Sequence, residues 1–170
     1  FRVDGTKVFG KPVGLQGTKL AVDTLIITML TKHNDDLIEA VEAAGVEVEG
    51  VMVSPLAASL VILTTAQKTA GVVLSNIGAE TLSIVVFDND VPISIKVFPI
   101  GSSDITNKIA LSFQIPPIEA EQMKRGAVTG SDVSPKKMNA IVSSRLKDMF
   151  TIVEAHLKSI GRNRLLPAGI

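Results

Sequence analysis

The pattern of hydrophobic and polar positions changes its period along the chain. Stretches rich in β-branched residues and bounded by glycine, proline or asparagine are typical of strands. After a glycine-rich opening, we predict a long strand over residues 19–31 and another over residues 46–55. Three more strands are expected at residues 71–76, 81–89 and 91–100, and the first two of these form a tight hairpin.

Helical spacing of apolar residues predicts five helices between and after these strands. Their expected first residues are Asn34, Pro55, Ser102 or Ser103, Pro116-Pro117 and Ser134. The helix from Pro55 is expected to be short and buried, and the last helix continues to Gly161 with one apolar stripe. That stripe consists of Met138, Ile141, Val142, Leu146, Met149, Val153, Leu157 and Ile160. The mixture of strands and helices predicts an α/β or α+β fold.

Composition excludes several classes of function. Hydrophobic residues make up 46% of the 170, enough for a core, while 17 Lys+Arg balance 17 Asp+Glu. Because the net charge is zero and Trp and Tyr are absent, we expect no nucleic-acid partner. The absence of Cys removes disulfides, thiol nucleophiles and Cys-ligated metals, and suits a reducing compartment. Asp23 interrupts the best apolar stretch, so no bilayer span is predicted.

The two ends of the sequence indicate a fragment of a longer protein. The chain opens on Phe1 rather than Met, with no signal-peptide pattern. It closes on "LLPAGI", which reads as the first residues of a strand.

The hairpin "LSNIGAETLSIVV", residues 74–86, is the first candidate site. A turn that offers consecutive backbone N–H groups can bind an anion, and Gly78 would let the backbone approach it closely. Thr81 adds a hydroxyl, and Asn76 could accept from a metal-bound water. Glu80 would oppose a phosphate unless it points away. The residues leave two interpretations open, a phosphate-binding turn or an ordinary hairpin.

A second candidate lies in "EAEQMK", where Glu121 and Lys124 are spaced i, i+3 and share one helical face. A carboxylate and an ammonium so placed can hold the two hydroxyls of a ribose. Such pairs also decorate solvated helices. His33 and His156 have no Ser–His–Asp or metal-ligand companions at local spacing, so we assign them to surface structure and predict no catalytic residue and no metal centre.

The order of strand, glycine hairpin, two strands and two helices resembles the second lobe of the actin/Hsp70-like ATPase fold. Within it, the sequence is similar to the bacterial cell-division family FtsA over residues 11–28, 33–93, 96–124 and 136–150. The pilus-assembly relative PilM shares the fold and parts of the hairpin. "KPVGL" and "GSSDITNKIA" are more similar to FtsA.

The resemblance implies an α/β, actin-like (ribonuclease H-like) lobe with part of the FtsA inserted subdomain, which is of the SHS2 type. It also implies a division of the chain into five parts. These are residues 1–32, the C-terminal part of the inserted subdomain 1C; 33–69, the remainder of the first lobe, 1A; 70–101, the second lobe 2A with its phosphate hairpin; 102–160, a trimmed helical 2B; and 161–170, the start of a truncated 2A strand.

The function that the resemblance implies is that of an adaptor. FtsA tethers the polymer FtsZ to the cytoplasmic membrane, assembles into actin-like filaments, and lies peripherally on the inner face of the membrane at the division site. Its membrane contact is a C-terminal amphipathic helix, which this sequence lacks. The alternatives are an actin-fold ATPase whose turnover is the output and a PilM-like scaffold that binds a membrane protein's N-terminal peptide.

The same resemblance implies the site residues. The second phosphate loop falls on Asn76, Gly78, Ala79, Glu80 and Thr81, and the ribose-binding pair on Glu121 and Lys124. Asn76 replaces the usual aspartate, and Ala79-Glu80 replaces glycines. We therefore expect nucleotide response with weak or no hydrolysis, a residual ATPase at most. ATP with Mg²⁺ is expected in the full-length protein and no cofactor in this fragment.

The FtsZ tail, which mixes acidic and apolar residues, is expected to dock on the long helix. Lys137 and Arg145 flank Ile141 on the helical wheel, giving two cations around an apolar residue. Arg145 would be the anchor, because a guanidinium pairs bidentately with carboxylates. The alternative interpretation is a solvated helix rim.

Overall fold

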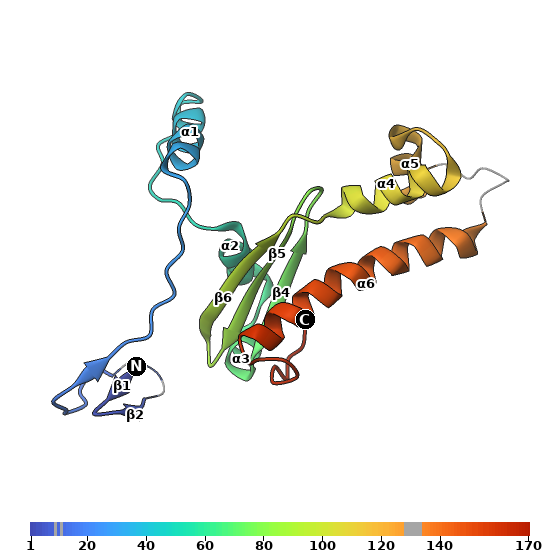
Figure 1. Ribbon diagram of the computed structural model, residues 1–170. Coiled ribbons are helices and arrows are strands. Elements are labelled where there is room, and N and C mark those ends of the chain that lie inside the picture. The colour runs from blue at the N-terminus through green and yellow to red at the C-terminus, as the bar shows by residue number, and fades with distance from the viewer. Residues whose placement is uncertain (9, 11, 128–133) are drawn as a thin grey trace.

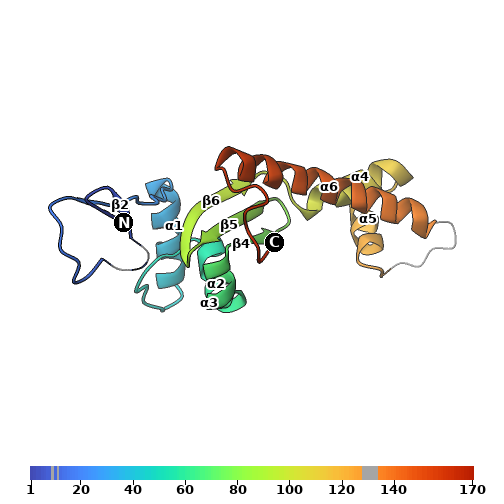
Figure 2. The ribbon, with the colours of Figure 1, turned by 90° about the horizontal axis from the view of Figure 1, so that it is seen from below.

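The computed structural model describes residues 1–8, 10, 12–127 and 134–170. A small N-terminal sheet is joined by an extended segment to helix α1, Thr31–Glu42. The remainder of the chain builds a larger sheet with helices on both of its faces (Figure 1). The two views agree that the small sheet stands apart from the larger one (Figure 2).

The N-terminal sheet is much shorter than the sequence predicts. Its antiparallel strands are β1, Arg2–Val3, β2, Thr6–Lys7, and β3, Leu20–Ala21, in the order β2-β1-β3. The long strand expected over 19–31 is therefore wrong beyond β3, and residues 22–30 hold no regular structure. None of the described strands lies beside residues 22–30 to supply the hydrogen bonds that a strand needs.

The segment before the larger sheet shows a second missing strand and an unexpected helix. Residues 46–53 hold no strand. Helix α2, Ser54–Ile62, has Pro55 in its first turn as predicted, yet most of its side chains are not buried. Helix α3, Thr65–Ala70, was not expected. A capping box defines its start, because the Thr64 hydroxyl accepts from the Gln67 amide and the Gln67 side chain from the Thr64 amide.

The larger sheet confirms the three predicted strands. Strands β4, Val72–Ile77, β5, Leu82–Asp88, and β6, Val91–Phe98, pair antiparallel in the order β4-β5-β6. Strand β5 lies in the centre, and all but its last residue is buried. The β5–β6 turn has positive φ angles at Asn89 and Asp90, conformations that Asn and Asp tolerate better than most residues.

The helices cover both faces of this sheet (Figure 2). One face of the sheet packs against α4, Ser102–Phe113, and α6, Pro135–Ser159, with α5, Pro117–Lys124, beside α4. The whole apolar stripe predicted for the long helix faces this core. The opposite face packs Val72, Val85 and Phe87 against Leu56 and Leu63 at α2. Burial of these apolar side chains is the main stabilising term of the fold.

The final residues run beside β4 without forming a regular strand. The Ala168 amide donates to the Gly71 carbonyl at 3.0 Å, and the Val73 amide donates to the Gly169 carbonyl at 2.9 Å. The two segments run in the same direction. The strand start expected in "LLPAGI" is thus replaced by two backbone hydrogen bonds at the edge of the sheet.

Candidate functional site

The turn between β4 and β5 is closed by one backbone hydrogen bond. The Gly78 amide donates to the Thr81 carbonyl at 2.8 Å. Ala79, Glu80 and Thr81 are exposed. Within the described part of the chain, the Ala79 and Glu80 amides and the Thr81 hydroxyl donate to no acceptor. Two consecutive N–H groups and a hydroxyl therefore remain available to an anion.

The first turn of α4 is hydrogen-bonded to the carbonyl groups of this hairpin turn. The Ser102 amide donates to the Gly78 carbonyl at 2.9 Å and the Ser103 amide to the Ala79 carbonyl at 2.8 Å. The N-cap is Gly101 rather than a serine, and Asp104 accepts from its amide at 2.9 Å. A Cβ at Gly101 would overlap the Ala79 carbonyl, so only glycine lets the two backbones meet. Helix start and hairpin form one unit.

Glu121 and Lys124 on α5 meet Thr106 of α4. The Glu121 Oε2 atom accepts from the Thr106 hydroxyl at 2.5 Å and lies 2.7 Å from the Lys124 Nζ. The Lys124 Nζ also donates to the Thr106 Oγ1 at 2.8 Å and to the Ser102 carbonyl at 3.1 Å. Arg125 donates to Glu121 Oε1 at 2.8 Å.

These contacts fix the charge of the Glu121 carboxyl. Hydrogen bonds from Lys124, then Thr106, then Arg125 lower the pKa of Glu121 from 4.5 to about 2. Glu121 is therefore a carboxylate at neutral pH, and it can accept hydrogen bonds but donate none.

A single residue, Ser102, connects the hairpin turn to the Glu121–Lys124 pair, the two groups that the sequence predicts to bind nucleotide. Ser102 donates its amide to Gly78 of the hairpin turn and accepts at its carbonyl from Lys124 of α5. Asn76 and Glu80 are exposed and make no side-chain hydrogen bond or ion pair within the described residues. The role of these residues in nucleotide binding stays a prediction.

The three residues predicted to bind the FtsZ tail are partly engaged within the fold. Lys137 donates to the Ser112 carbonyl at 3.1 Å, and its Nζ lies 4.5 Å from the centre of the Phe113 ring. Ile141 is half-buried against the core. Arg145 pairs with Asp148 at 3.1 Å. Lys137 and Ile141 thus pack α6 onto its neighbours, and tail binding stays a prediction.

Sequence reasoning missed three contributors to this region. Arg125 stands four residues after Glu121, so helical spacing could have added it to the pair. Gly101 precedes two serines that looked like better caps. Thr106 lies 15 residues before Glu121, and no local pattern connects them.

His156 is half-buried rather than a surface residue. Its Nε2 lies 2.9 Å from the Ser94 hydroxyl, and its ring meets Phe98 edge-on at 6.1 Å between centroids. Burial, followed by the nearby Lys96 charge, lowers the pKa of His156 below 6.5. Among the described residues, no group of His, Asp and Glu side chains is arranged to hold a metal ion.

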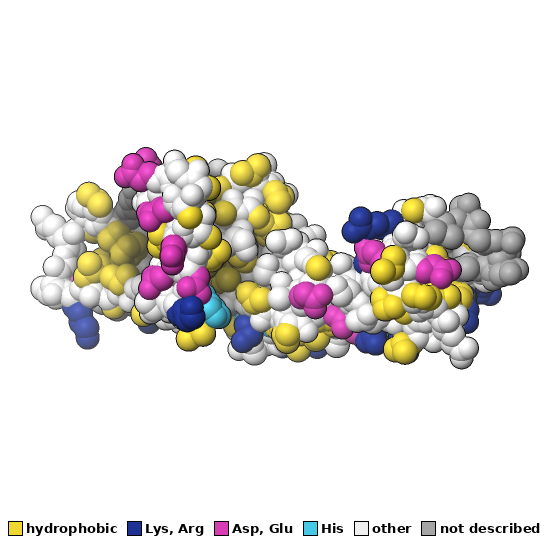
Figure 3. All heavy atoms as spheres, turned by 90° about the horizontal axis from the view of Figure 1, so that it is seen from above, with side chains coloured by type: hydrophobic (Ala, Val, Ile, Leu, Met, Phe, Trp, Pro, Cys, Tyr) yellow, Lys and Arg dark blue, Asp and Glu magenta, His cyan; other side chains and the backbone are white. Residues whose placement is uncertain are grey.

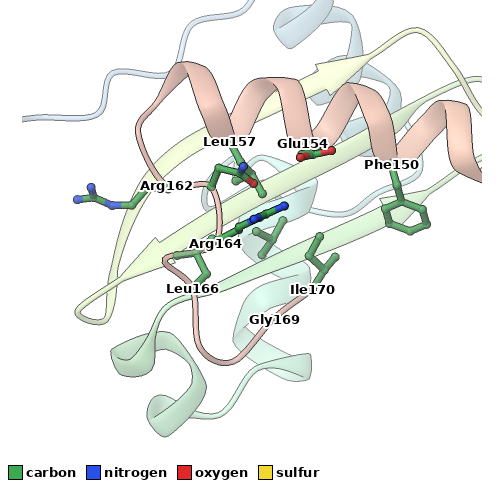
Figure 4. Close-up of a pocket in the computed structure, with 10 residues that line it drawn as sticks. Phe150, Glu154, Leu157, Arg162, Arg164, Leu166, Gly169 and Ile170 are labelled. Carbon is green, nitrogen blue, oxygen red and sulfur yellow. The ribbon is translucent and has the colours of Figure 1, made fainter.

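A separate cleft of about 210 Å³ opens between the second half of α6 and the C-terminal segment (Figure 4). Phe150, Leu157, Leu166 and Ile170 supply its apolar lining, and Glu154, Arg162 and Arg164 are also at its wall. None of the residues predicted to bind nucleotide or FtsZ lines this cleft. In the part of the chain that the structure describes, no helix combines the length and hydropathy needed to cross a bilayer.

The chain matches the model of a known protein family. The family described as "Cell division protein FtsA" matches residues 73–158, half of the chain.

Curated relatives agree with that match. FtsA of Pseudomonas aeruginosa is 26% identical over 189 residues, which cover 99% of this chain and 45% of the relative. FtsA of Bacillus subtilis is 28% identical over 95% of this chain and 41% of the relative. FtsA of Escherichia coli K12 is 31% identical over 79% of this chain and 33% of the relative. The chain spans less than half the length of these relatives.

Two solved structures share the fold. One is the ethanolamine utilization protein EutJ from Carboxydothermus hydrogenoformans, with a TM-score of 0.63 and 21% identity, covering 77% of this chain and 44% of EutJ. The other is in the PilM-PilN type IV pilus biogenesis complex, with a TM-score of 0.59 and 22% identity, covering 75% of this chain and 36% of that one. These similarities confirm the predicted α/β fold of the actin-like type.

Proposed function

The chain belongs to the FtsA family of cell division proteins, and on that premise we propose that the whole protein is a cell-division adaptor. It links the FtsZ polymer to the inner face of the cytoplasmic membrane at the division site and self-associates into actin-like filaments. Residues 1–32 belong to the inserted subdomain, 33–69 to the first lobe, and 70–170 to the second lobe. Its membrane contact would be a C-terminal amphipathic helix of the whole protein.

A nucleotide-responsive adaptor is supported by one observation: hydrogen bonds connect the hairpin turn to α5. Ser102 is hydrogen-bonded to Gly78 on one side and to Lys124 on the other. A ligand that touched both the turn and α5 would therefore act on one connected unit. This supports coupling between nucleotide binding and the position of the α4–α5 pair.

The donors at the turn fit the phosphates of ATP. The Ala79 and Glu80 amides and the Thr81 hydroxyl are free to donate, and Glu121, held in place by Lys124, would bind the ribose. Mg²⁺ would supply charge neutralisation at the phosphates. Asn76 brings no carboxylate to organise the metal and its water, so turnover is weak or absent and the protein acts by binding.

Reconstitution tests the adaptor role. The intact protein is mixed with FtsZ filaments and vesicles that carry anionic lipid, and the vesicles are floated through a density gradient. We expect FtsZ to float only when the protein is present. If FtsZ stays at the bottom although the protein itself floats, the adaptor proposal is wrong.

A charge reversal tests the docking surface. Arg145→Glu in the intact protein should weaken binding of a fluorescent FtsZ tail peptide about tenfold, the cost of one lost charge-assisted contact. Lys147→Glu, an exposed cation two residues away on the same helix, is the matched control. Equal affinity in both variants would remove Arg145 from the docking surface.

The rate of phosphate release distinguishes an adaptor from an ATPase whose function depends on ATP hydrolysis. We expect slow release from the intact protein and faster release from Asn76→Asp, which restores a carboxylate beside the turn. Fast release by the unaltered protein would favour the ATPase interpretation.

A further inference from the structure

Thr106 is a buried hydroxyl between two charged side chains. It lies on the second turn of α4 with 6% of its surface exposed. Its hydroxyl donates to Glu121 Oε2 at 2.5 Å and accepts from Lys124 Nζ at 2.8 Å. A longer contact of 3.3 Å joins it to the Ser102 carbonyl. One hydroxyl therefore contacts both the carboxylate and the ammonium.

The hydrogen-bonding capacity of Lys124 is fully used. An ammonium has three N–H donors and no acceptor. Its three acceptors here are Glu121 Oε2 at 2.7 Å, Thr106 Oγ1 at 2.8 Å and the Ser102 carbonyl at 3.1 Å. The side chain is thus held in one orientation, and the carbonyl of Ser102 is its most distant acceptor.

Glu121 keeps one position for another donor. Each carboxylate oxygen accepts about two hydrogen bonds. Oε2 has Thr106 and Lys124, whereas Oε1 has Arg125 alone at 2.8 Å. Because the Glu121 side chain is one-third exposed, Oε1 has capacity for a further donor, such as a sugar hydroxyl, beside Arg125.

From this arrangement we propose that Thr106 is a positioning residue for nucleoside recognition. Its hydroxyl holds Oε2 of Glu121 against α4 and so keeps Oε1 presented to a ribose hydroxyl. The inference rests on the proposed nucleotide role of Glu121 and Lys124. A valine at this place would have the same shape, yet it would leave an N–H of the partly buried Lys124 ammonium and a lone pair of the Glu121 carboxylate without partners.

The test compares two nucleotides in the intact protein. Affinities for ATP and for 2′,3′-dideoxy-ATP, which lacks both ribose hydroxyls, are measured with Mg²⁺ for the unaltered protein, Thr106→Val and Thr106→Ser. We expect the unaltered protein and Thr106→Ser to prefer ATP about tenfold, and Thr106→Val to lose most of that preference. If Thr106→Val keeps the preference, or weakens both nucleotides equally, Thr106 does not position the ribose contact.

A second measurement separates this inference from the nucleotide proposal. The Glu121 carboxyl is titrated by ¹³C NMR in the same three proteins without nucleotide. Loss of the hydroxyl should raise the pKa of Glu121 in Thr106→Val, and Thr106→Ser should leave it low. That result together with no ATP binding by the unaltered protein would reject the nucleotide role while supporting Thr106 as the residue that positions Glu121. An unchanged titration in Thr106→Val would overturn the inference.

Discussion

The regions before and after Gly71 contain similar apolar residues, but only the region after Gly71 buries them in a hydrophobic core. Every buried hydrophobic residue of the described core lies between Val72 and Leu157. Of the described residues before Gly71, only Pro55 and Ser59 are buried. Figure 3 shows apolar side chains open on the surface of the N-terminal region. Among the large ones are Val22, Ile26, Leu30, Val51, Met52 and Val61.

The difference shows that an apolar, β-branched stretch becomes a strand only beside a partner. Strand β5 is hydrogen-bonded to β4 on one side and to β6 on the other. Residues 22–30 are also rich in apolar side chains, but no strand of the described part of the chain pairs with them, and they stay extended. Backbone hydrogen bonds and cross-strand packing, rather than composition alone, decide the outcome.

The sharpest test of this comparison truncates one isoleucine in each region. Ile109 on α4 is fully buried, whereas Ile62 on α2 is 61% exposed. Ile109→Ala should lower the free energy of unfolding by about 2–5 kcal/mol, because it removes buried apolar contacts and leaves a cavity. Ile62→Ala should change it by less than about 0.5 kcal/mol. Urea unfolding followed by circular dichroism measures both, and similar costs would break the comparison.

The next largest expected loss of stability comes from substituting alanine for Gly101. Gly101→Ala places a methyl group against the Ala79 carbonyl and 2.7 Å from the Glu80 nitrogen, which are backbone atoms that cannot rotate away. We expect a loss of about 1–3 kcal/mol and disruption of the amide contacts of Ser102 and Ser103. The control is Gly50→Ala in the N-terminal region, where a Cβ meets nothing within 4 Å. Thermal unfolding compares the variants, and equal melting temperatures would contradict the close packing at Gly101.

Each region also contains one carboxylate, Asp4 before Gly71 and Glu121 after it, whose contribution to stability depends on acid pH. The pKa of Glu121 is lowered to about 2, and hydrogen bonds from Thr18 and Lys19 lower the pKa of Asp4. Each contribution is present above the unfolded-state pKa and is lost as the pH falls through the folded one. From pH 4.5 towards 2, the stability gap between the unaltered protein and Glu121→Gln should close.

Hydrogen exchange shows where each carboxylate acts. Asp4→Asn should reduce amide protection only in the small N-terminal sheet, because none of the described residues of that sheet is buried in a core shared with the rest. Glu121→Gln should act on the α4–α5 region. A global loss of protection in Asp4→Asn would contradict the separation of the two regions.

The smallest expected effect on stability is the pH dependence that His156 contributes. Because burial lowers its pKa below 6.5, the unfolded chain takes up a proton before the folded one does. Stability should therefore fall as the pH drops below 6.5, and His156→Gln should lack this dependence. Urea midpoints at pH 7.5 and 5.5 measure the difference, with His33→Gln in the exposed part of α1 as the matched substitution. A midpoint in the unaltered protein that does not fall would refute this.

Much of the second region could be predicted from the sequence. The three strands and the apolar stripe of α6 depend on local patterns that the final packing reinforces, and before Gly71 the same holds for helix α2 with Pro55 in its first turn. The strands expected over 19–31 and 46–55 did not form, apart from β3, because no described strand lies beside these segments. At the site, the i, i+3 pair was visible in the sequence. Thr106 and Gly101 were not, since their roles arise from contacts 15 and about 22 residues away along the chain.

The two hydrogen bonds that join the segments around Gly71 and Gly169 have a further consequence. They bring the entry and exit of the larger sheet region to the same place. A circular permutant could therefore link Gly169 back to Gly71 through a short spacer and begin at the Asn89–Asp90 turn, with every strand neighbour kept. The topology thus makes this half of the chain transferable as one unit.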